Sequence, residues 1–294
     1  MPYPCFFFLL WLGLVLVSSV RAQPNIDIVS FNSQHFTSRY KDSTKHKIYT
    51  QDNFFSLFAP IKFGKGHVFM LRINGEQLSV TRSDSVKLKY TLYSVGLPIG
   101  LQLQSKNEKW KYAGIFIAKY NSDFKDNLDY DLQFGGIALV TRVINPKLQV
   151  RLGLYCNGEF WRTAFVPLIG VDWKVNDKFR MYGTMPGYYR FEYKLANKIY
   201  TGFGFRSAQR SFRLQAKYDD DFVRIRENQL KLFFEGFVVG KILLGVEAYY
   251  GLGYSLIRYD YFKTKTEKPG LNVFTKSKNG FGVVFNLAYR IRVD

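Results

Sequence analysis

Charged side chains recur at every second position inside otherwise apolar stretches of this sequence. Arg151, for example, stands between Val150 and Leu152 in the run 148–156. Residues two apart lie on the same face of a β-strand, so this spacing gathers charged groups on one side of a sheet. The cations at such positions are Arg151, Lys174, Arg180, Arg190, Lys194, Arg206, Arg210, Lys231, Arg290 and Arg292, and the acids are Glu159, Asp172, Glu192, Glu235 and Glu247.

Two hypotheses account for this charged face. Charges that leave bulk water require partners, so the groups can pair with one another and fill the space that they enclose. Alternatively, the ten cations exceed the five acids, and unpaired arginines line a narrow aqueous path that favours anions, as basic rings do in pores. The sequence leaves both hypotheses open.

Residues that could form a hydrolase site are few. A nucleophilic serine needs a histidine held against it, and Ser33 is the serine nearest to His35 in the sequence. His35 and His46 fall in a polar stretch that we expect to be the first loop, and His67 follows the first short turn. We interpret the three histidines as solvated side chains, and we expect no enzymatic activity.

The sequence also predicts neither a metal site nor a cofactor. Cys156 is the only cysteine beyond the N-terminal segment, and the histidines do not have the spacing of zinc ligands. The acidic run 219–221 is expected to be a solvated loop. The glycines near 202 and 251 have strand spacing and no strand-to-helix context, so they do not indicate a nucleotide-binding loop.

The elements that carry the charged face are predicted to be β-strands. In 281–293 the odd positions are all apolar, whereas the even positions are small, polar or cationic. In 242–254 the even positions from Ile242 to Tyr254 form an apolar face opposite Glu247 and several glycines. A wholly apolar face opposite a charged face that contains glycines predicts a closed barrel with lipid outside and polar groups inside.

The N-terminus predicts export. Residues 6–17 form an apolar run of twelve, which is shorter than the roughly 20 residues of a membrane-spanning helix. Val20-Arg21-Ala22 has the spacing of a signal-peptidase site, so we predict a signal peptide over 1–22, cleaved before Gln23, and one barrel domain over 23–294. The mature chain cannot form an internal disulfide, which suits a bacterial envelope better than an extracellular animal protein.

Composition and charge narrow the expected partners. Aromatic residues make up 18% of the chain, and the formal net charge is +19. Such a charge can suit nucleic acid, but we expect none because an exported protein seldom meets it. The expected partners are outer-membrane lipid, lipopolysaccharide and the barrel assembly machinery, together with anionic small solutes under the anion-path hypothesis.

Turn signals give the strand count. Short breaks rich in Asn, Gly and Lys occur near 63–69, 106–112, 144–150, 175–181, 195–201 and 238–244, and longer polar stretches lie between them. Fourteen strands follow, with twelve as the alternative because two are short and the first is weakly patterned. The predicted strands are 24–34, 51–63, 67–80, 89–104, 110–122, 129–144, 148–160, 163–175, 179–185, 188–196, 199–210, 225–239, 242–256 and 279–293.

One part of the chain carries a family resemblance. The run VPLIGVDWKVNDKFRMYGTMPG, followed by FEYKLANKIYTGFGFR, resembles a family of uncharacterised outer-membrane β-barrel proteins found mainly in Bacteroidota. The resemblance implies the architecture and supplies no substrate or catalytic residue. One departure is the end of the chain, where many such proteins have an aromatic residue and this one has Val293 and Asp294.

Together these features predict an all-β, closed antiparallel transmembrane barrel in the bacterial outer membrane. The leading functional hypothesis is a passive channel or small-solute transporter with a basic lumen. The second is a plugged barrel with a structural or surface-interaction role, and the third is an enzyme acting on lipid or lipopolysaccharide.

Overall fold

The protein is described by a computed structural model, which covers residues 25–39, 47–82, 89–125, 131–160, 162–215, 221–259 and 277–292. In these ranges no helix is long and apolar enough to cross a membrane. The regular elements are fourteen strands: β1 (Asn25–Arg39), β2 (Lys47–Phe63), β3 (His67–Arg82), β4 (Lys89–Gln104), β5 (Trp110–Ser122), β6 (Leu132–Asn145), β7 (Leu148–Glu159), β8 (Arg162–Lys174), β9 (Phe179–Met185), β10 (Tyr188–Ala196), β11 (Ile199–Arg213), β12 (Phe222–Val239), β13 (Ile242–Tyr259) and β14 (Gly280–Arg292).

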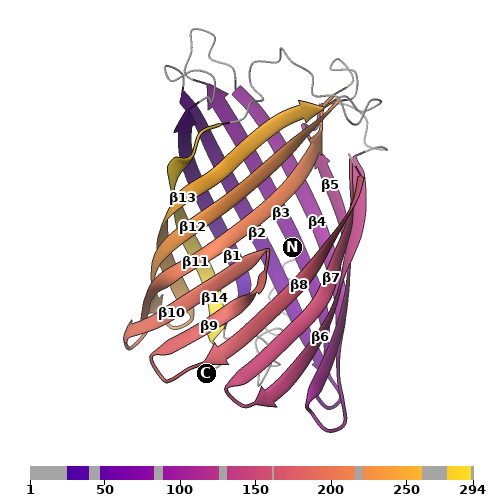
Figure 1. The fold of residues 1–294 in the computed structure, drawn as a ribbon, viewed down its shortest axis with the longest axis vertical. Helices are drawn as coiled ribbons and strands as arrows, with labels where there is room; N and C mark the ends of the chain where they lie inside the picture. The colour runs from indigo at the N-terminus through magenta and orange to yellow at the C-terminus, as the bar shows by residue number, and fades with distance from the viewer. Residues whose placement is uncertain are drawn as a thin grey trace, which may run out of the picture.

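The strands form one closed barrel in which each pairs antiparallel with its neighbours in sequence and β1 closes on β14 (Figure 1). The predicted fourteen strands are confirmed, and the alternative of twelve is wrong. The main difference is the first hairpin, where β1 continues to Arg39 and β2 starts at Lys47. Phe36 and Ser38 are buried and pair with Thr50 and Ile48, so alternation continues there. The two strands therefore extend into both ends of the stretch predicted as a loop. The predicted signal peptide, 1–22, lies outside the described residues.

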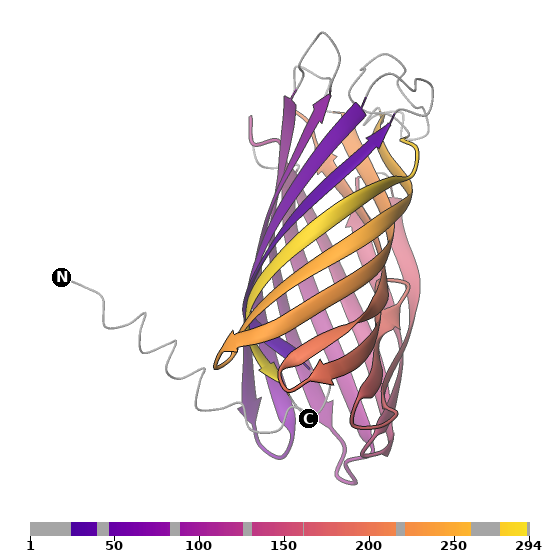
Figure 2. The same cartoon turned by 90° about the vertical axis from the view of Figure 1, so that its left-hand side faces the viewer.

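The two ends of the barrel differ. Six turns of two to five residues lie at one end, which we call the turn end, and β1 begins and β14 ends there (Figure 2). At the opposite end, β7 and β8 are joined by only two residues, 160–161, whereas the two-residue turn between β9 and β10, 186–187, lies partway along the wall (Figure 1). The remaining connections at that end fall mostly outside the described residues.

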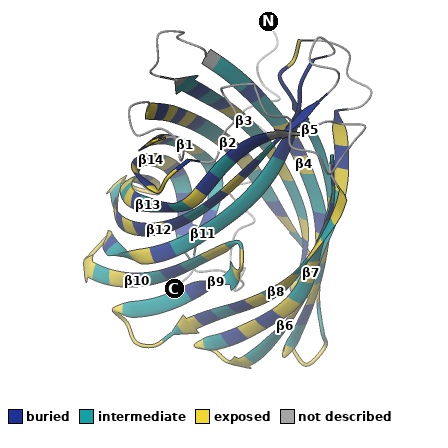
Figure 3. Cartoon of the chain, turned by 45° about the horizontal axis from the view of Figure 1, so that its top comes forward, coloured by how far each residue is buried: buried dark blue, intermediate teal, exposed yellow. Residues whose placement is uncertain are grey.

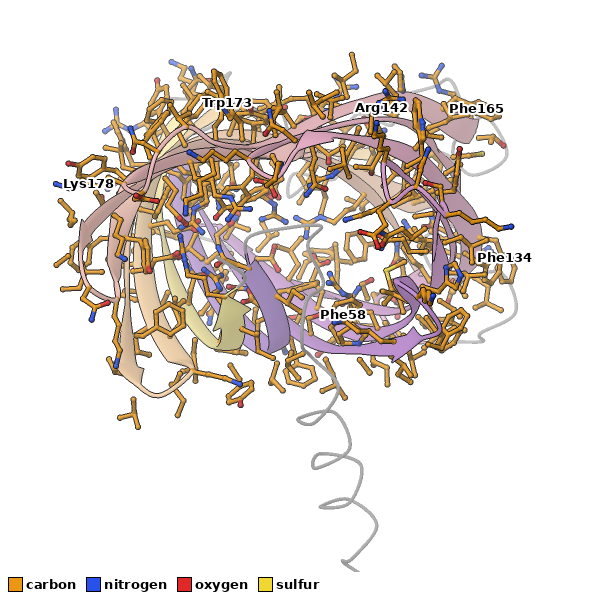
Figure 4. All side chains as sticks on the ribbon, turned by 90° about the horizontal axis from the view of Figure 1, so that it is seen from below. Phe58, Phe134, Arg142, Phe165, Trp173 and Lys178 are labelled. Atoms are coloured by element: carbon orange, nitrogen blue, oxygen red, sulfur yellow. The ribbon has the colours of Figure 1, made fainter. Side chains whose placement is uncertain are left out.

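The outer surface of the barrel is apolar. Leu152, Phe165 and Ile169 are each more than 60% exposed. Seen from below, Phe134, Phe165 and Trp173 lie on the outer side of the wall and Phe58 on its inner side (Figure 4). Because the strands pair around a closed barrel, an apolar exterior of this kind suits the hydrocarbon core of a membrane.

Tyr254 departs from the predicted parity. The sequence pattern placed it on the apolar outer face, but it is only 5% exposed and its ring lies 5.1 Å from that of Phe36 inside the barrel. The cause is an irregularity in β13 at Gly253, which has a φ of +64°. At the same place the register between β12 and β13 shifts, between Arg226 and Asn228 of β12. One extra residue in a strand exchanges the inner and outer faces beyond it.

The far end of β11 leaves the wall and crosses the interior. Pairing between β10 and β11 ends at Arg206, and the last residue of β11, Arg213, makes a parallel pairing with Ser122 of β5. Figure 3 shows buried residues gathered where the ends of β11 and β12 approach β5. The barrel is therefore narrower at the end opposite the turns.

Candidate functional site

The interior towards the turn end holds a network of buried ion pairs. Arg190 contacts Glu235 at 2.8 Å and Glu247 at 3.9 Å. Arg290 contacts the other carboxylate oxygen of Glu235 at 2.9 Å and Asp27 at 2.5 Å. Glu235 thus lies between two arginines, from β10 and β14. Such an arrangement compensates the cost of burying each charge.

Two further cations are paired beside this network. Lys231 contacts Glu247 at 2.7 Å, and Arg292 contacts Glu192 at 2.5 Å. The guanidinium carbon of Arg292 also lies 3.8 Å from the centre of the Tyr200 ring, a cation–π arrangement. Both pairs join strands on the same side of the barrel.

Asp172 of β8 pairs with two more of the predicted cations, Arg180 and Arg151. Arg180 donates two hydrogen bonds to it, at 2.8 and 2.9 Å, in a bidentate pair. Arg151 lies 3.9 Å away and is buried. The three residues come from β7, β8 and β9, three consecutive strands.

Two further predicted residues lie near the turn end. Lys174 contacts Asp177 at 3.0 Å in an exposed turn, and its hydrogen bond lowers the pKa of that carboxyl group. Lys194 is half-buried near the end of β10, and its backbone N–H donates to Lys178 at 2.8 Å. These two lysines belong to the rim.

Arg210 is the centre of a second network, further from the turns. It contacts Asp52 at 3.1 Å and Glu227 at 3.3 Å and also pairs with Glu76. Arg206 lies 3.6 Å from Glu227. The three acids come from β2, β3 and β12, so Arg210 connects strands across the barrel.

Sequence reasoning missed four of these acids: Asp27, Asp52, Glu76 and Glu227. Asp27, Asp52 and Glu76 lie in the first three strands, and Glu227 has the same parity as Lys231 and Glu235 in β12. In β2 the signal was present, because Asp52 has the same parity as the buried Thr50 and Ser56. With these acids included, carboxylates accompany the predicted interior arginines, and the apparent excess of cations is offset.

Beyond the charged networks, an apolar cluster lies inside the narrow end. The Phe36 ring stacks on Tyr249, with ring centres 5.8 Å apart, and contacts Tyr254. Inner-face glycines make room for these rings, since a Cβ on Gly282 would lie 2.2 Å from the Tyr249 ring. We call this cluster the plug: Phe36, Ile48, Leu78, Val80, Leu92, Phe212, Leu214, Val223, Ile225, Tyr249, Tyr254, Leu256 and Val284.

The inner face of β5–β8 is also apolar, but it is not packed. Phe116 and Phe165 mark the outer parity of β5 and β8, and the buried Lys111 and Asp172 mark the inner one. The inner positions between these landmarks are half-buried, so the described residues leave part of their apolar surface uncovered. We call them the apolar wall: Ala113, Ile115, Ile117, Ile137, Leu139, Ala164, Val166 and Leu168. Its sequence signal is the loss of alternation in AGIFIA (113–118) and GGIALV (135–140).

Polar contacts hold the crossing end of β11 against the opposite wall. Asn121 of β5 donates to the backbone oxygen of Ser211 at 3.0 Å, and Gln133 of β6 donates to its hydroxyl group at 2.9 Å. Ser211 in turn donates to Glu159 of β7. Ser211 is fully buried, so these contacts fix β11 across the interior.

The candidate hydrolase residues lie on the outside. His35 belongs to β1 and is exposed, so its predicted place in a loop is wrong. Its Nε2 lies 3.1 Å from the Ser33 hydroxyl, which also donates to Asn53 at 2.8 Å. Within the described residues no recorded carboxylate contact orients His35, as a catalytic histidine would need. His46 lies outside the described residues, and His67 accepts a hydrogen bond from the backbone of Gln104.

Metal-binding groups are not gathered in the described part of the chain, where no cluster of three His, Cys, Asp or Glu side chains occurs. Cys156 is a free, half-buried cysteine on the outer parity of β7. Asp221, predicted in a solvated loop, is fully buried, and its backbone oxygen accepts a hydrogen bond from Leu214. The rest of that acidic run lies outside the described residues.

A groove of about 680 Å³ lies on the outer side of β4–β7. Its floor is formed by backbone at Gly114 and Gly136, and Phe116 and Leu154 stand at its sides. Because it faces outward on the apolar surface, it belongs to the lipid-facing band.

Several solved structures resemble this fold. An outer membrane channel of Pseudomonas putida F1 matches with a TM-score of 0.48 and 8% identity, over 94% of this chain and 100% of the other. OprB of Pseudomonas putida matches at 0.39 and 9% identity, over 91% and 93%. The translocator domain of the autotransporter NalP from Neisseria meningitidis matches at 0.37 and 10% identity, over 97% and 94%. Similarity at this level carries no information about function.

No curated protein matches the sequence. A family model, by contrast, matches residues 18–294, which is nearly the whole chain and includes every strand of the barrel. That family is described as a domain of unknown function, so the match assigns no role. The chain therefore belongs to the family of the domain of unknown function DUF6268.

Proposed function

We propose that this protein is an exported outer-membrane β-barrel of the channel type, which takes a small, largely apolar molecule into a chamber inside the barrel. The chamber is bounded by the apolar wall on one side, the ion-pair networks on the other and the plug at the narrow end. The half-buried state of the apolar wall is the observation that carries the proposal, because unfilled apolar surface favours an apolar occupant.

The charged networks favour this proposal over a basic, anion-selective lumen. An anion path requires cations whose charge is available to the solute. Arg190, Arg210 and Arg290 instead lie within 3.1 Å of carboxylates. Among the predicted functions, the pairing favours the self-filled lumen near the turns, and the apolar wall indicates where a solute fits.

A binding experiment tests the chamber. The refolded mature protein in detergent is titrated with an apolar fluorophore such as 1-N-phenylnaphthylamine, whose emission rises in an apolar site. Leu139→Gln places a polar group on the apolar wall, so affinity should fall about tenfold, which corresponds to about 1.4 kcal/mol of binding free energy.

Val140→Gln is the matched control, because Val140 is the next residue of β6 and lies on the outer parity. It should leave the affinity unchanged. Equal effects of the two substitutions would place the dye on the outer surface or in the detergent, and would overturn the chamber.

A further inference from the structure

The wall of the barrel is interrupted between β8 and β11. Pairing of β8 with β9 covers only Ile169–Lys174, and pairing of β10 with β11 ends at Arg206. Above the short β9–β10 hairpin, the edges formed by 162–168 and 207–210 have no ladder pairing with each other. In Figure 1 the ribbons of β8 and β11 diverge above that hairpin and approach again at their upper ends. We call this interruption the seam.

Isolated hydrogen bonds, with no ladder, join the two ends of the seam; at the upper end Ser211 also donates to Glu159 of β7. At the lower end, the backbone N–H of Ser207 donates to Gly187 at 2.8 Å. At the upper end, the backbone N–H of Phe160 donates to the Ser211 hydroxyl at 3.4 Å. A continuous β-ladder would resist separation far more strongly than these contacts, so the seam is the part of the wall best suited to widen.

The outer face of β11 changes character at the seam. Phe203 is an exposed apolar residue on the outer parity, whereas the next positions of that parity beyond Phe205 are Ser207 and Gln209. Ser207 donates to Asn228 at 2.7 Å, and Arg226 donates to Gln209 at 3.3 Å. Polar groups and unpaired strand edges are costly against hydrocarbon, so this face suits water or a polar head group.

The exposed charges beside the seam are cationic. Arg162, at the start of β8, and Arg226 of β12 are exposed, and the Arg206 side chain is 33% exposed. The neighbouring acids, Glu159 and Glu227, are buried and already accept hydrogen bonds or ion pairs. Arg226 donates to the neutral side chain of Gln209, so an anionic head group finds a complementary charge at this residue.

The inner side of the seam is apolar. Ala164, Val166 and Leu168 belong to the apolar wall, lie on the edge strand β8 and are half-buried. The hydrocarbon chain of a bound molecule that passes the edge of β8 would leave the polar face of β11 and contact these side chains directly. The seam thus presents a cationic polar side and an apolar side to the same molecule.

We infer that the seam is a lateral entrance, through which a single-chain anionic amphiphile of the fatty-acid type passes from the membrane into the chamber. Its carboxylate lies at Arg226, and its acyl chain passes the edge of β8 and lies along Ala164, Val166 and Leu168. This inference rests on the proposed function, because it requires the chamber as its destination.

The test is photo-cross-linking in phosphatidylethanolamine–phosphatidylglycerol vesicles that contain the refolded protein and a diazirine-bearing long-chain fatty acid. The protein carries Phe160→Cys and Ser211→Cys in a Cys156→Ser background, so that oxidation closes the upper end of the seam. With the cysteines reduced, adducts should map to the segments 113–117 and 164–168, and oxidation should lower that labelling about tenfold.

A second pair of variants covers the case in which the disulfide between positions 160 and 211 does not form. Ala164→Trp fills the inner side of the seam and should also lower the labelling, whereas Ala138→Trp, on the outer parity of β6, should not. Labelling of the inner segments that survives both closure and Ala164→Trp would overturn the lateral entrance. Stronger labelling by a two-chain phosphatidylglycerol diazirine probe would overturn the single-chain assignment.

The outcomes separate the two proposals. Suppose that fluorophore binding depends on Leu139 but that labelling is unchanged by the disulfide between positions 160 and 211. This result supports the chamber and rejects the seam as its entrance. Absence of both fluorophore binding and inner-wall labelling rejects the chamber itself.

Discussion

At the scale of single residues, Glu235 links two buried arginines of the interior. It accepts from Arg190 and Arg290, which come from strands on either side of β12 in the barrel order. Both arginines are buried, so each depends on this carboxylate to remain charged away from water. Glu235 is therefore important for keeping both buried arginines charged.

Glu235→Gln should destabilise the barrel by about 3 kcal/mol, because it leaves two buried guanidinium groups with one carboxylate fewer. Urea unfolding of the protein refolded in lipid vesicles measures this. Lys174→Ala is the control, since its pair with Asp177 lies in an exposed turn and should contribute nothing measurable. Equal stability of the two variants would show that the network does not support the fold.

At the scale of strands, parity decides what each residue contacts. β7 shows this clearly, because Leu152 is 63% exposed and Arg151 is 5% exposed although they are adjacent in sequence. The same rule explains why Tyr254 was misplaced, since the irregularity at Gly253 exchanges the faces and no single sequence pattern marks it.

Leu152→Arg should block insertion, because it places a charge on the lipid face at a cost of roughly 2–4 kcal/mol near the membrane midplane. Arg151→Leu should be milder, since Asp172 keeps its bidentate partner Arg180. Heat-modifiable migration on gels after refolding reports insertion. If both variants inserted equally well, the assignment of inner and outer faces in β7 would be wrong.

At the scale of the whole molecule, the plug and the crossing end of β11 close the barrel at the end opposite the turns. Neither the charged networks nor the apolar wall alone would do so. In this conformation the wild-type protein should show little steady conductance in a planar bilayer.

Phe36→Ala combined with Tyr254→Ala should open that end, because the two substitutions remove stacked rings from the middle of the plug. Single-channel recording should then show stepwise conductance that the wild-type protein lacks. Phe31→Ala combined with Phe55→Ala removes two rings from the outer face instead and should leave the protein silent. Conductance in the wild-type protein itself would show that the plug does not close the barrel.

The sequence alone determined the strands, their number and most of their parity. Strand alternation and turn chemistry are local, so β3 to β5 and β7 to β11 could be placed within a few residues of their ends. The alternating positions also indicated which charged residues belong to the inner face, including Arg190, Arg290 and Glu247.

Only the tertiary structure decided what those charges do and where the interior remains unfilled. Arg210 contacts Asp52 across 158 residues, and Arg290 contacts Asp27 across 263, so no local pattern could pair them. The plug, the apolar wall and the seam likewise arise from closure of the barrel and from the short β9–β10 hairpin, which leaves β8 and β11 unpaired above it. Contacts set by closure depend on which strands meet in space, and that information lies in the fold as a whole.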